Sequence, residues 1–378
     1  MNPASLFLAG MHVLALAWWQ DRAPAVDQIP VFIVGQDGYH TYRIPSVIVT
    51  SKGTVLAFCE GRKSGRGDTG DIDLLLKRSS DGGRTWSKAQ VVWDEGENVC
   101  GNPCPVIDRD TGTIWLLLTH NLREDTEVKI VDGTSKASRT CWVSKGTDDG
   151  VAWARPVEIT RDVKRPDWSW YATGPGVGIQ TKAGRLVIPC DNKVLGAKAR
   201  QSHVIYSDDH GASWKLGGVV GPQCNESQIA ELTDGRLMLN MRSYEANKRR
   251  LVATSADDGL TFTKPVEDEA LIEPVCQASI LRYSGLRANE RNIILFSNPA
   301  STKREKLTVR ASFDDGKTWP AANLLHGGPA AYSCLTVLPG GTIGCLYERG
   351  TDSPYETITF ARFPLDWLSD KAAEPSKD

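Results

Sequence analysis

The stretch Ser312-Phe313-Asp314-Asp315-Gly316-Lys317-Thr318-Trp319 decides the fold, because it is one copy of the repeated pattern Ser-x-Asp-x-Gly-x-Thr-Trp. We call this pattern the Asp box. Copies recur at intervals of about 50 to 70 residues, as in architectures whose repeated units bury their apolar faces only against their neighbours. Other copies begin at Ser79, Ser207 and Ser255, and a degenerate one contains Asp148, Gly150 and Trp153. The repeat predicts a β-propeller.

The residue types of the Asp box are those of a tight turn. Ser and Asp side chains bond to nearby backbone N–H groups, Gly supplies the positive φ that closes the turn, and the final aromatic residue packs back onto the blade. An Asp that holds a turn is a poor acid or base. We therefore interpret the box aspartates as structural and exclude them from the search for catalytic carboxylates.

Composition fits one large unit of many short strands. The chain has 378 residues and 35 glycines, and six blades of four antiparallel strands would use roughly this length. Strand-like runs include Gly184–Pro189, Gly235–Leu239 and Arg291–Phe296. With 44 basic and 46 acidic residues the charge is nearly balanced, so we expect no nucleic acid or anionic membrane as partner. The predicted fold class is an all-β, six-bladed β-propeller of four-stranded antiparallel blades.

The N-terminal segment Ala4–Trp19 is apolar but shorter than the roughly 18 residues of a membrane span. Small residues follow it, as at a signal-peptide cleavage site, although no Lys or Arg precedes it. We predict a signal peptide or N-terminal extension over 1–25, the propeller over 26–370 and a short tail over 371–378. This organisation favours a secreted or periplasmic protein without stable membrane insertion. The alternative is an N-terminal strand or helix that packs on the propeller. In that case a cytoplasmic location is the alternative to export.

The nine cysteines indicate neither a disulfide framework nor a metal site. Most lie in apolar runs, where a thiol serves as a small hydrophobic group, and an odd number leaves at least one unpaired. Cys100 and Cys104 have no His or second Cys pair at zinc spacing. We expect no metal and no organic cofactor.

Three arginines in strand-like contexts are the first candidates for a binding site: Arg43, Arg242 and Arg310. A single strand arginine usually faces solvent. In a propeller, however, corresponding positions of different blades converge on the central axis. Guanidinium groups bind carboxylates through paired hydrogen bonds, and three together would hold one carboxylate. Such a cluster needs a counter-ion, and Glu348 is the candidate.

The order of these motifs resembles the exo-α-sialidase (neuraminidase) family of six-bladed propellers. The resemblance rests on Tyr42-Arg43-Ile44-Pro45, the Asp boxes, the two later arginines and the segments around Tyr332 and Glu348, and it runs from about Val31 to Phe363. Asp boxes alone also occur in unrelated propellers. The combination in this order carries the specificity.

The resemblance implies how the substrate is held. Arg43, Arg242 and Arg310 match the triad that binds the carboxylate of sialic acid, and Glu348 matches the residue that steadies the first arginine. Gly101–Pro105 resembles a segment that lines the pocket for the N-acyl group, with Asn102 as its contributor. The aromatic residues of Asp167–Tyr171 lie where a glycerol side chain or an aglycone could rest, and a role in core packing is the equal alternative.

The resemblance also implies the nucleophile, Tyr332, and the carboxylate that accepts its proton, Glu226. Sialidases are a known exception to the two-carboxylate rule of glycosidases. A sialoside carries its carboxylate on the anomeric carbon, and a carboxylate nucleophile at about 4 Å would meet a repulsion of about 4 kcal/mol at an effective dielectric near 20. A neutral phenol avoids that repulsion but needs an adjacent base.

The general acid/base is assigned to Asp68, and Glu60 and Arg62 match contacts near the 4-hydroxyl of the sugar. Asp71 and Asp73 are alternatives in the same segment, but they lead into an apolar strand. Asp68 lies in the Gly-rich, polar part of the loop, which suits an acid that closes over substrate.

The sequence thus predicts a retaining exo-α-sialidase that acts on sialylated glycans, glycoproteins or glycolipids, and we expect a monomer. Two alternatives stay open. One is sialyl transfer, to another sugar or within the same molecule, on the same residues. The other is a sialic-acid-binding propeller without turnover, which the presence of Tyr332, Glu226 and Asp68 disfavours.

Overall fold

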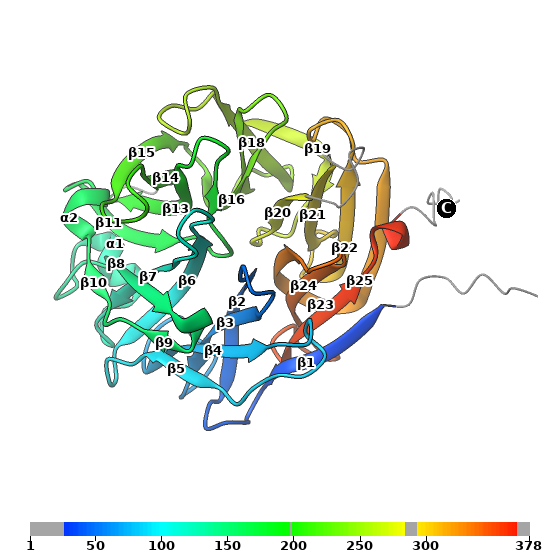
Figure 1. Cartoon of the computed structure of the whole chain (residues 1–378). Coiled ribbons are helices and arrows are strands. Elements are labelled where there is room, and N and C mark those ends of the chain that lie inside the picture. Colours follow the sequence, from blue (N-terminus) through cyan, green and yellow to red (C-terminus); the bar gives the residue numbers. More distant parts are fainter. Residues whose placement is uncertain (1–25, 197–198, 284–292, 369–378) are drawn as a thin grey trace, which may run out of the picture.

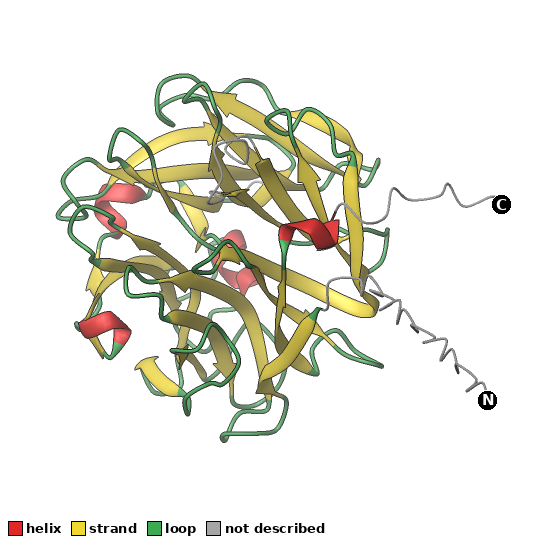
Figure 2. Cartoon of the chain, turned by 45° about the vertical axis from the view of Figure 1, so that its right-hand side comes forward, coloured by secondary structure: helices red, strands yellow, loops and turns green. Residues whose placement is uncertain are grey.

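The computed structural model describes residues 26–196, 199–283 and 293–368, and these form a ring of short sheets around a central axis (Figure 1). Strands joined by loops and turns make up the ring, and the helices are short (Figure 2). The prediction of an all-β propeller is confirmed. The predicted signal peptide over 1–25 and the tail over 371–378 lie outside the described residues.

Within the described residues, the strand pairings group into six consecutive four-stranded antiparallel units. The strands of each unit are named in order from the axis outward, beginning with the first three units. Unit 1 holds β2 (Thr41–Val49), β3 (Val55–Arg62), β4 (Ile72–Ser79) and β5 (Gln90–Trp93). Unit 2 holds β6 (Val99–Ile107), β7 (Ile114–Asn121), β8 (Thr140–Thr147) and β10 (Val157–Glu158), with β9 (Ala152–Trp153) also on β8. Unit 3 holds β11 (Trp168–Thr173) with β12 (Ile179–Gln180), β13 (Leu186–Val194), β14 (Arg200–Ser207) and β15 (Lys215–Val220).

The second half of the ring closes on the first. Unit 4 holds β16 (Cys224–Glu231), β17 (Leu237–Ser243), β18 (Arg249–Ser255) and β19 (Val266–Ile272). Unit 5 holds β20 (Ser279–Tyr283), β21 (Ile293–Pro299), β22 (Glu305–Ser312) and the first part of the long β23 (Ala321–Val337). Unit 6 holds the rest of β23, β24 (Ile343–Arg349), β25 (Thr357–Phe363) and β1 (Asp27–Ile33). Because β1 comes from the opposite end of the chain and pairs with β25, it closes the ring.

In the described part of the chain, the helices are the connections α1 (Glu127–Asp132) and α2 (Thr160–Val163) and the 3₁₀ turns Asp148–Gly150 and Leu365–Leu368. Thr126 caps α1 by accepting a hydrogen bond from the backbone N–H of Lys129, and Gly133 ends the helix at φ 71°. Among the residues that the structure describes, no helix is long and apolar enough to cross a membrane.

The Asp boxes are turns, as predicted. In four of them the box serine is the last residue of the third strand of its unit, as Ser207 is of β14. The Oδ1 of Asp209 accepts hydrogen bonds from the Ser207 hydroxyl (2.7 Å) and the backbone N–H of Ser213 (2.9 Å). The bonds to Ser213 lower the pKa of Asp209 to about 2. The other intact boxes repeat this geometry.

Each box glycine also packs on the preceding unit. An added Cβ on Gly211 of unit 3 would lie 2.2 Å from Trp115 of unit 2, and one on Gly83 of unit 1 would lie 2.2 Å from Phe360 of unit 6. The box tryptophans of units 1 and 2 follow the same rule: Trp86 stacks edge-on against Phe360, and Trp153 against Phe58. The ring of Trp153 also lies over Gly146 of its own unit, so for that box the expectation that the aromatic packs back onto the blade is met, and the contact with the preceding unit is additional.

The apolar clusters lie between neighbouring units rather than within one. One cluster joins Leu186 and Ile188 of unit 3 to Leu117 of unit 2, and another joins Phe296 of unit 5 to Met238 of unit 4. All nine cysteines are buried free thiols, which confirms their reading as small apolar side chains.

Because the box glycines combine positive φ with close contact, we predict that Gly211→Ala destabilises the protein more than Gly235→Ala. Both glycines have φ near 87° (86° and 88°), but an added Cβ at Gly235 meets no atom within 4 Å. The contact with Trp115 should cost about 1–3 kcal/mol more. Thermal unfolding at a fixed scan rate would measure the difference, and equal losses of Tm in the two variants would contradict the packing argument.

Candidate active site

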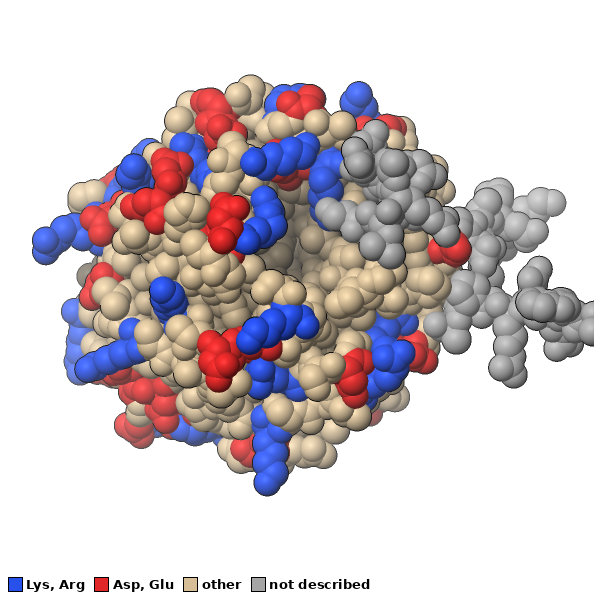
Figure 3. All heavy atoms as spheres, viewed as in Figure 1, with Lys and Arg blue, Asp and Glu red and all other residues tan. Residues whose placement is uncertain are grey.

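A polar cavity of about 190 Å³ collects side chains from all six units at one end of the ring. Its described lining residues are Arg43, Ile44, Glu60, Arg62, Asp68, Asn102, Glu127, Arg139, Trp170, Ala172, Asp191, Asn225, Glu226, Arg242, Tyr244, Arg304 and Tyr332. On the outer surface, by contrast, basic and acidic side chains alternate around the hollowed centre of the face in Figure 3. Charged side chains from several units are therefore gathered in the cavity rather than in a patch of one sign on this face.

A shared backbone irregularity places the axial residues. Four innermost strands carry a one-residue bulge at the cavity: Arg43–Ser46 in β2, Gly101–Cys104 in β6, Cys224–Ser227 in β16 and Ala330–Ser333 in β23. In each bulge the innermost strand advances three residues while the neighbouring strand advances two. A bulge breaks the alternation of side chains and re-aims them. Asn102, Glu226 and Tyr332 all lie inside these bulges.

Tyr332 and Glu226 form the centre of the site. The Tyr332 hydroxyl donates a hydrogen bond of 2.5 Å to Oε1 of Glu226, whose Oε2 accepts one of 2.6 Å from Arg242. Burial and then the negative charge of Glu226 raise the pKa of Tyr332 well above its usual value, although Arg242 and Arg304 act in the opposite direction. The phenol is therefore neutral at neutral pH, with a base in place to receive its proton.

Glu348 holds the first arginine, as predicted. It is fully buried behind the cavity, and its Oε1 accepts hydrogen bonds from Nε of Arg43 (2.7 Å) and the backbone N–H of Ile44 (3.0 Å). Its Oε2 accepts one from the backbone N–H of Tyr332 (3.1 Å). One carboxylate thus fixes an arginine and the backbone of the tyrosine beside it.

The arginine that joins Arg43 and Arg242 around Tyr332 is Arg304. The prediction that Arg310 is the third member of this triad is wrong. Arg304 lies directly before β22, where its guanidinium donates to the Tyr355 hydroxyl (2.7 Å) and the Val275 carbonyl (3.3 Å) and lies 5.6 Å from the Tyr332 ring centre. Arg310 is not among the residues that line the cavity.

The correction has a geometric reason. Arg310 stands in the middle of the third strand of its unit, two residues before the box serine Ser312. The box end of that strand is the end opposite the cavity. Six residues of strand separate Arg310 from Arg304, which is about 20 Å at roughly 3.3 Å per residue. An arginine beside an Asp box cannot reach the site.

Glu60, Arg62 and Asp68 lie together in the cavity, as predicted. Arg62 is buried and donates to Oε2 of Glu60 (2.5 Å), and its Nη1 lies 2.8 Å from Oδ1 of Asp68. The Asp68 side chain is 68% exposed, so it lies at the mouth. Partial desolvation raises its pKa, but the charges of Arg62 and Arg43 outweigh this and lower the pKa below its usual value.

The alternatives Asp71 and Asp73 are engaged elsewhere. Both form ion pairs with Lys63, at 2.9 and 3.1 Å, and the Tyr39 hydroxyl donates to Asp73 (2.6 Å). Neither is among the described residues of the cavity, so Asp68 is the acidic residue of this loop that the structure brings to the site.

A family model described as "BNR repeat-like domain" matches residues 53–345. The chain is 36% identical over 362 residues to "Sialidase" of Micromonospora viridifaciens, which covers 91% of this chain and 55% of that protein. It is 32% identical to "Exo-alpha-sialidase" of Aspergillus fumigatus, and the alignment covers 92% of each.

The chain belongs to the sialidase family. Among solved structures, "Hadza microbial sialidase Hz136" superposes with a TM-score of 0.82 at 32% identity, over 90% of this chain and 69% of that one. The chain spans little more than half the length of some curated sialidases that it matches, 55% of the one from M. viridifaciens and 61% of the one from Bacteroides fragilis.

In this sialidase-family site, sequence reasoning missed most of the wall formed by units 2 and 3. Arg139 lies directly before β8, the same place in unit 2 that Arg304 has in unit 5. It donates to Oδ1 of Asn102 (2.5 Å) and lies 4.2 Å from the ring centre of Trp170. An arginine immediately before a third strand was the available signal.

The aromatic segment Asp167–Tyr171 divides between the two roles that were left open. Trp170 lines the cavity, whereas Trp168 and Tyr171 are buried in the core between units 2 and 3. A bulge in β11 between Trp168 and Trp170 breaks the alternation of side chains, so these two residues, although two positions apart, do not share a face.

Asp191 is a buried carboxyl in the same wall, at the end of β13. Its Oδ1 has no hydrogen-bond partner among the described residues. Burial, and then the negative charges of Glu226 and Glu127, raise its pKa well above the usual value, while Lys193 and Arg139 act in the opposite direction. Burial therefore favours the protonated form of Asp191.

One group outside the cavity has metal-type ligands, namely Asp108, Asp110 and His210. Its members bond to one another and to Gln180: Nδ1 of His210 lies 2.9 Å from Asp108, and the Gln180 amide donates to both aspartates. These contacts explain why the three residues lie together: they join unit 2 to unit 3. The expectation that the protein uses no metal stays a prediction.

Since the folded state raises the pKa of Asp191, we predict that Asp191→Asn gains stability relative to wild type as pH rises. In the unfolded chain this carboxyl ionises near pH 3.9, so its contribution to stability is complete below that pH and is lost as the pH rises through the folded-state pKa. Asn carries no such proton. The difference in Tm should be at least about 2 °C larger at pH 8 than at pH 4, with the exposed Asp352→Asn as control. The same difference at both pH values would contradict a protonated Asp191.

Proposed function

We propose that this chain is a retaining exo-α-sialidase that hydrolyses terminal α-linked sialic acids of glycoconjugates through a covalent tyrosyl intermediate. The observation that carries the proposal is the neutral phenol of Tyr332, hydrogen-bonded to Glu226 and surrounded by Arg43, Arg242 and Arg304. Family membership supports the class of reaction.

The three arginines would hold the substrate carboxylate. Arg43 comes from unit 1, Arg242 from unit 4 and Arg304 from unit 5, so they approach one anion from different sides. Charge-assisted guanidinium–carboxylate bonds are among the strongest that proteins make. The anomeric carbon, which carries that carboxylate, would then lie next to the Tyr332 hydroxyl.

The nucleophilic step would use the hydrogen bond between Tyr332 and Glu226. As the Tyr332 oxygen attacks the anomeric carbon, its proton passes to Oε1 of Glu226, and the bond to the leaving sugar breaks. The neutral phenol avoids the repulsion of about 4 kcal/mol that a carboxylate would meet at about 4 Å from the substrate anion. Arg242 stays paired with Glu226 on its other oxygen.

Asp68 would act as the general acid and then as the base. It first protonates the departing glycosidic oxygen and then removes a proton from the water that cleaves the tyrosyl intermediate, which gives net retention. The pKa of Asp68 lies below its usual value, because Arg62 and Arg43 stabilise the charged form. A bound substrate would cover it and bring a second negative charge nearby, and both effects raise a carboxyl pKa.

Release of sialic acid from a fluorogenic sialoside, followed by proton NMR of the first-formed anomer, tests the proposal. The α-anomer as first product supports hydrolysis with retention. A β-anomer would contradict the tyrosyl intermediate, and an anhydro sugar or a sialylated acceptor would show transfer instead.

We predict that Tyr332→Phe lowers kcat by at least ~10²-fold, because the variant lacks the nucleophilic oxygen. The arginines are unchanged, so free sialic acid should still bind with similar affinity in calorimetry. Near-normal turnover in this variant would refute the nucleophile assignment.

We predict that Arg304→Lys raises KM by about tenfold or more, because a lysine cannot form paired bonds to a carboxylate. Arg310→Lys, in the strand β22 that Arg304 directly precedes, serves as the control and should leave KM and kcat unchanged. If the two variants behaved alike, Arg304 would have no place in the carboxylate site.

A further inference from the structure

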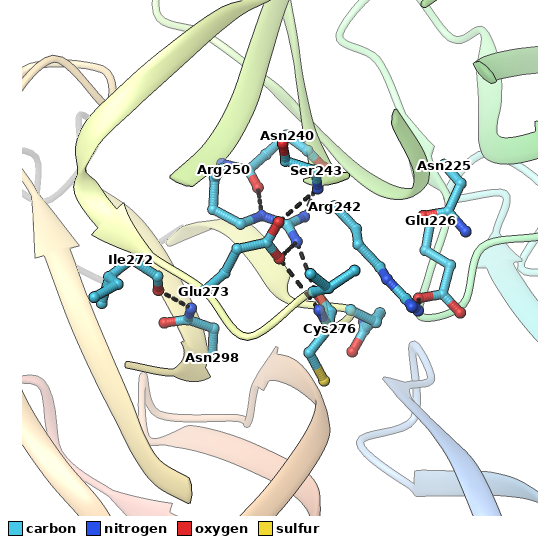
Figure 4. Close-up of polar contacts among 12 residues, drawn as sticks. Asn225, Glu226, Asn240, Arg242, Ser243, Arg250, Ile272, Glu273, Cys276 and Asn298 are labelled. Atoms are coloured by element: carbon cyan, nitrogen blue, oxygen red, sulfur yellow. Dashed lines mark hydrogen bonds and ion pairs between the residues drawn. The ribbon is translucent and has the colours of Figure 1, made fainter. Parts of the chain in front are cut away.

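A buried ion pair lies directly behind the arginines of the site (Figure 4). Arg250 in β18 and Glu273 just after β19 are 0% and 1% exposed, and their side chains meet at 2.9 Å. Neither is among the described residues of the cavity. The pair therefore does not touch a ligand in the cavity.

Stability alone is a weak reason for such a pair. Removing two charges from water costs several kcal/mol per ion, and apolar residues of similar size often serve a core as well or better. Arg250 and Glu273 use most of their remaining hydrogen-bonding capacity on backbone groups. Those backbone groups belong to two segments that carry or contact the site arginines.

The first segment is the end of β17. Arg250 donates to the Asn240 side chain (2.7 Å) and carbonyl (3.3 Å), and Glu273 accepts from the backbone N–H of Ser243 (2.5 Å). These contacts lie on either side of Arg242 in the chain. Figure 4 shows the Arg242 side chain leaving this framework toward Glu226.

The second segment is the loop 273–277. The backbone N–H of Cys276 donates to Glu273 (3.3 Å), and its carbonyl accepts from Arg250 (2.8 Å). Val275, which precedes it, has a φ of 57°, a strained value for a β-branched residue. In that conformation its carbonyl accepts the hydrogen bond from Arg304.

Arg242 and Arg304 repel each other, so their guanidinium groups would move apart unless contacts with the surrounding structure held them. The loop is anchored at its far end as well, because the Gln277 side chain bonds to both the carbonyl and the N–H of Ser333 (3.0 Å each), next to Tyr332. A rigid frame can therefore set where the two guanidiniums lie.

We propose that the Arg250–Glu273 ion pair is a positioning device that sets the separation of Arg242 and Arg304, and so the fit of the site to a carboxylate. It ties the end of β17 to the loop 273–277, and each of these segments fixes one arginine. This inference rests on the proposed function, since the carboxylate is that of the sialoside.

The test replaces the pair with apolar residues, Arg250→Met with Glu273→Leu, so that no buried charge is left alone. Folding should survive, with a Tm within about 5 °C of wild type. KM for a fluorogenic sialoside should rise at least tenfold while kcat changes much less, because the carboxylate is held in both the ground state and the transition state.

The control is Arg362→Met with Asp27→Leu, which removes a partly exposed ion pair between β25 and β1, away from the cavity. It should leave KM unchanged. A folded Arg250/Glu273 double variant with wild-type KM would overturn the positioning role. Absence of turnover in the wild-type protein would instead overturn the proposed function, so the two failures are distinguishable.

If the double variant does not fold, Glu273→Gln provides the second measurement. Gln keeps the shape and can still accept the bond from Ser243, but it lacks the charge that holds Arg250. We expect at least a threefold rise in KM with kcat less affected. A soluble Glu273→Gln protein with wild-type KM would refute the proposal.

Discussion

The one-residue bulge at the cavity end of the innermost strands is the constraint on which the site depends. A regular strand sends alternate side chains to opposite faces, and both faces of a propeller blade are needed for packing against neighbouring blades. The bulges in β2, β6, β16 and β23 interrupt that alternation at one height. They let Glu226 and Tyr332 face the axis while the rest of each strand stays in the core.

The site brings several positively charged arginines together, and carboxylates at different depths balance their charge. Glu348 is buried behind Arg43, Glu226 faces the cavity beside Arg242, and Glu273 lies deeper, paired with Arg250. Arg304 has no acidic partner among its described contacts and is held by Tyr355 and the strained Val275. The arginine with the weakest counter-charge thus depends most on backbone geometry, which is why the frame behind it matters.

The two ends of the ring divide the work. At the end opposite the cavity, Asp boxes close the turns, and their glycines lock each unit onto the preceding one through contacts such as Gly211 with Trp115. Buried apolar clusters then fill the space between units. The pairing of β1 with β25 closes the circle, and the cavity end carries the bulges, a strained valine and Asp191, whose Oδ1 has no hydrogen-bond partner among the described residues.

The sequence by itself determined the repeated hairpins, because the Asp box is a local motif whose own side chains close its turn. It also indicated Arg43, Glu226, Tyr332, Glu348 and Asp68 through motifs that stay close in the chain. Only the tertiary structure decided that Arg304 rather than Arg310 reaches the axis, and that Arg139 and Asp191 complete the wall. Arg304 directly precedes β22 and Arg310 lies within it, so the residue types in this segment do not show which of the two reaches the axis. What separates them is how far along the strand each one lies, and that distance acquires meaning only when six units meet around one axis.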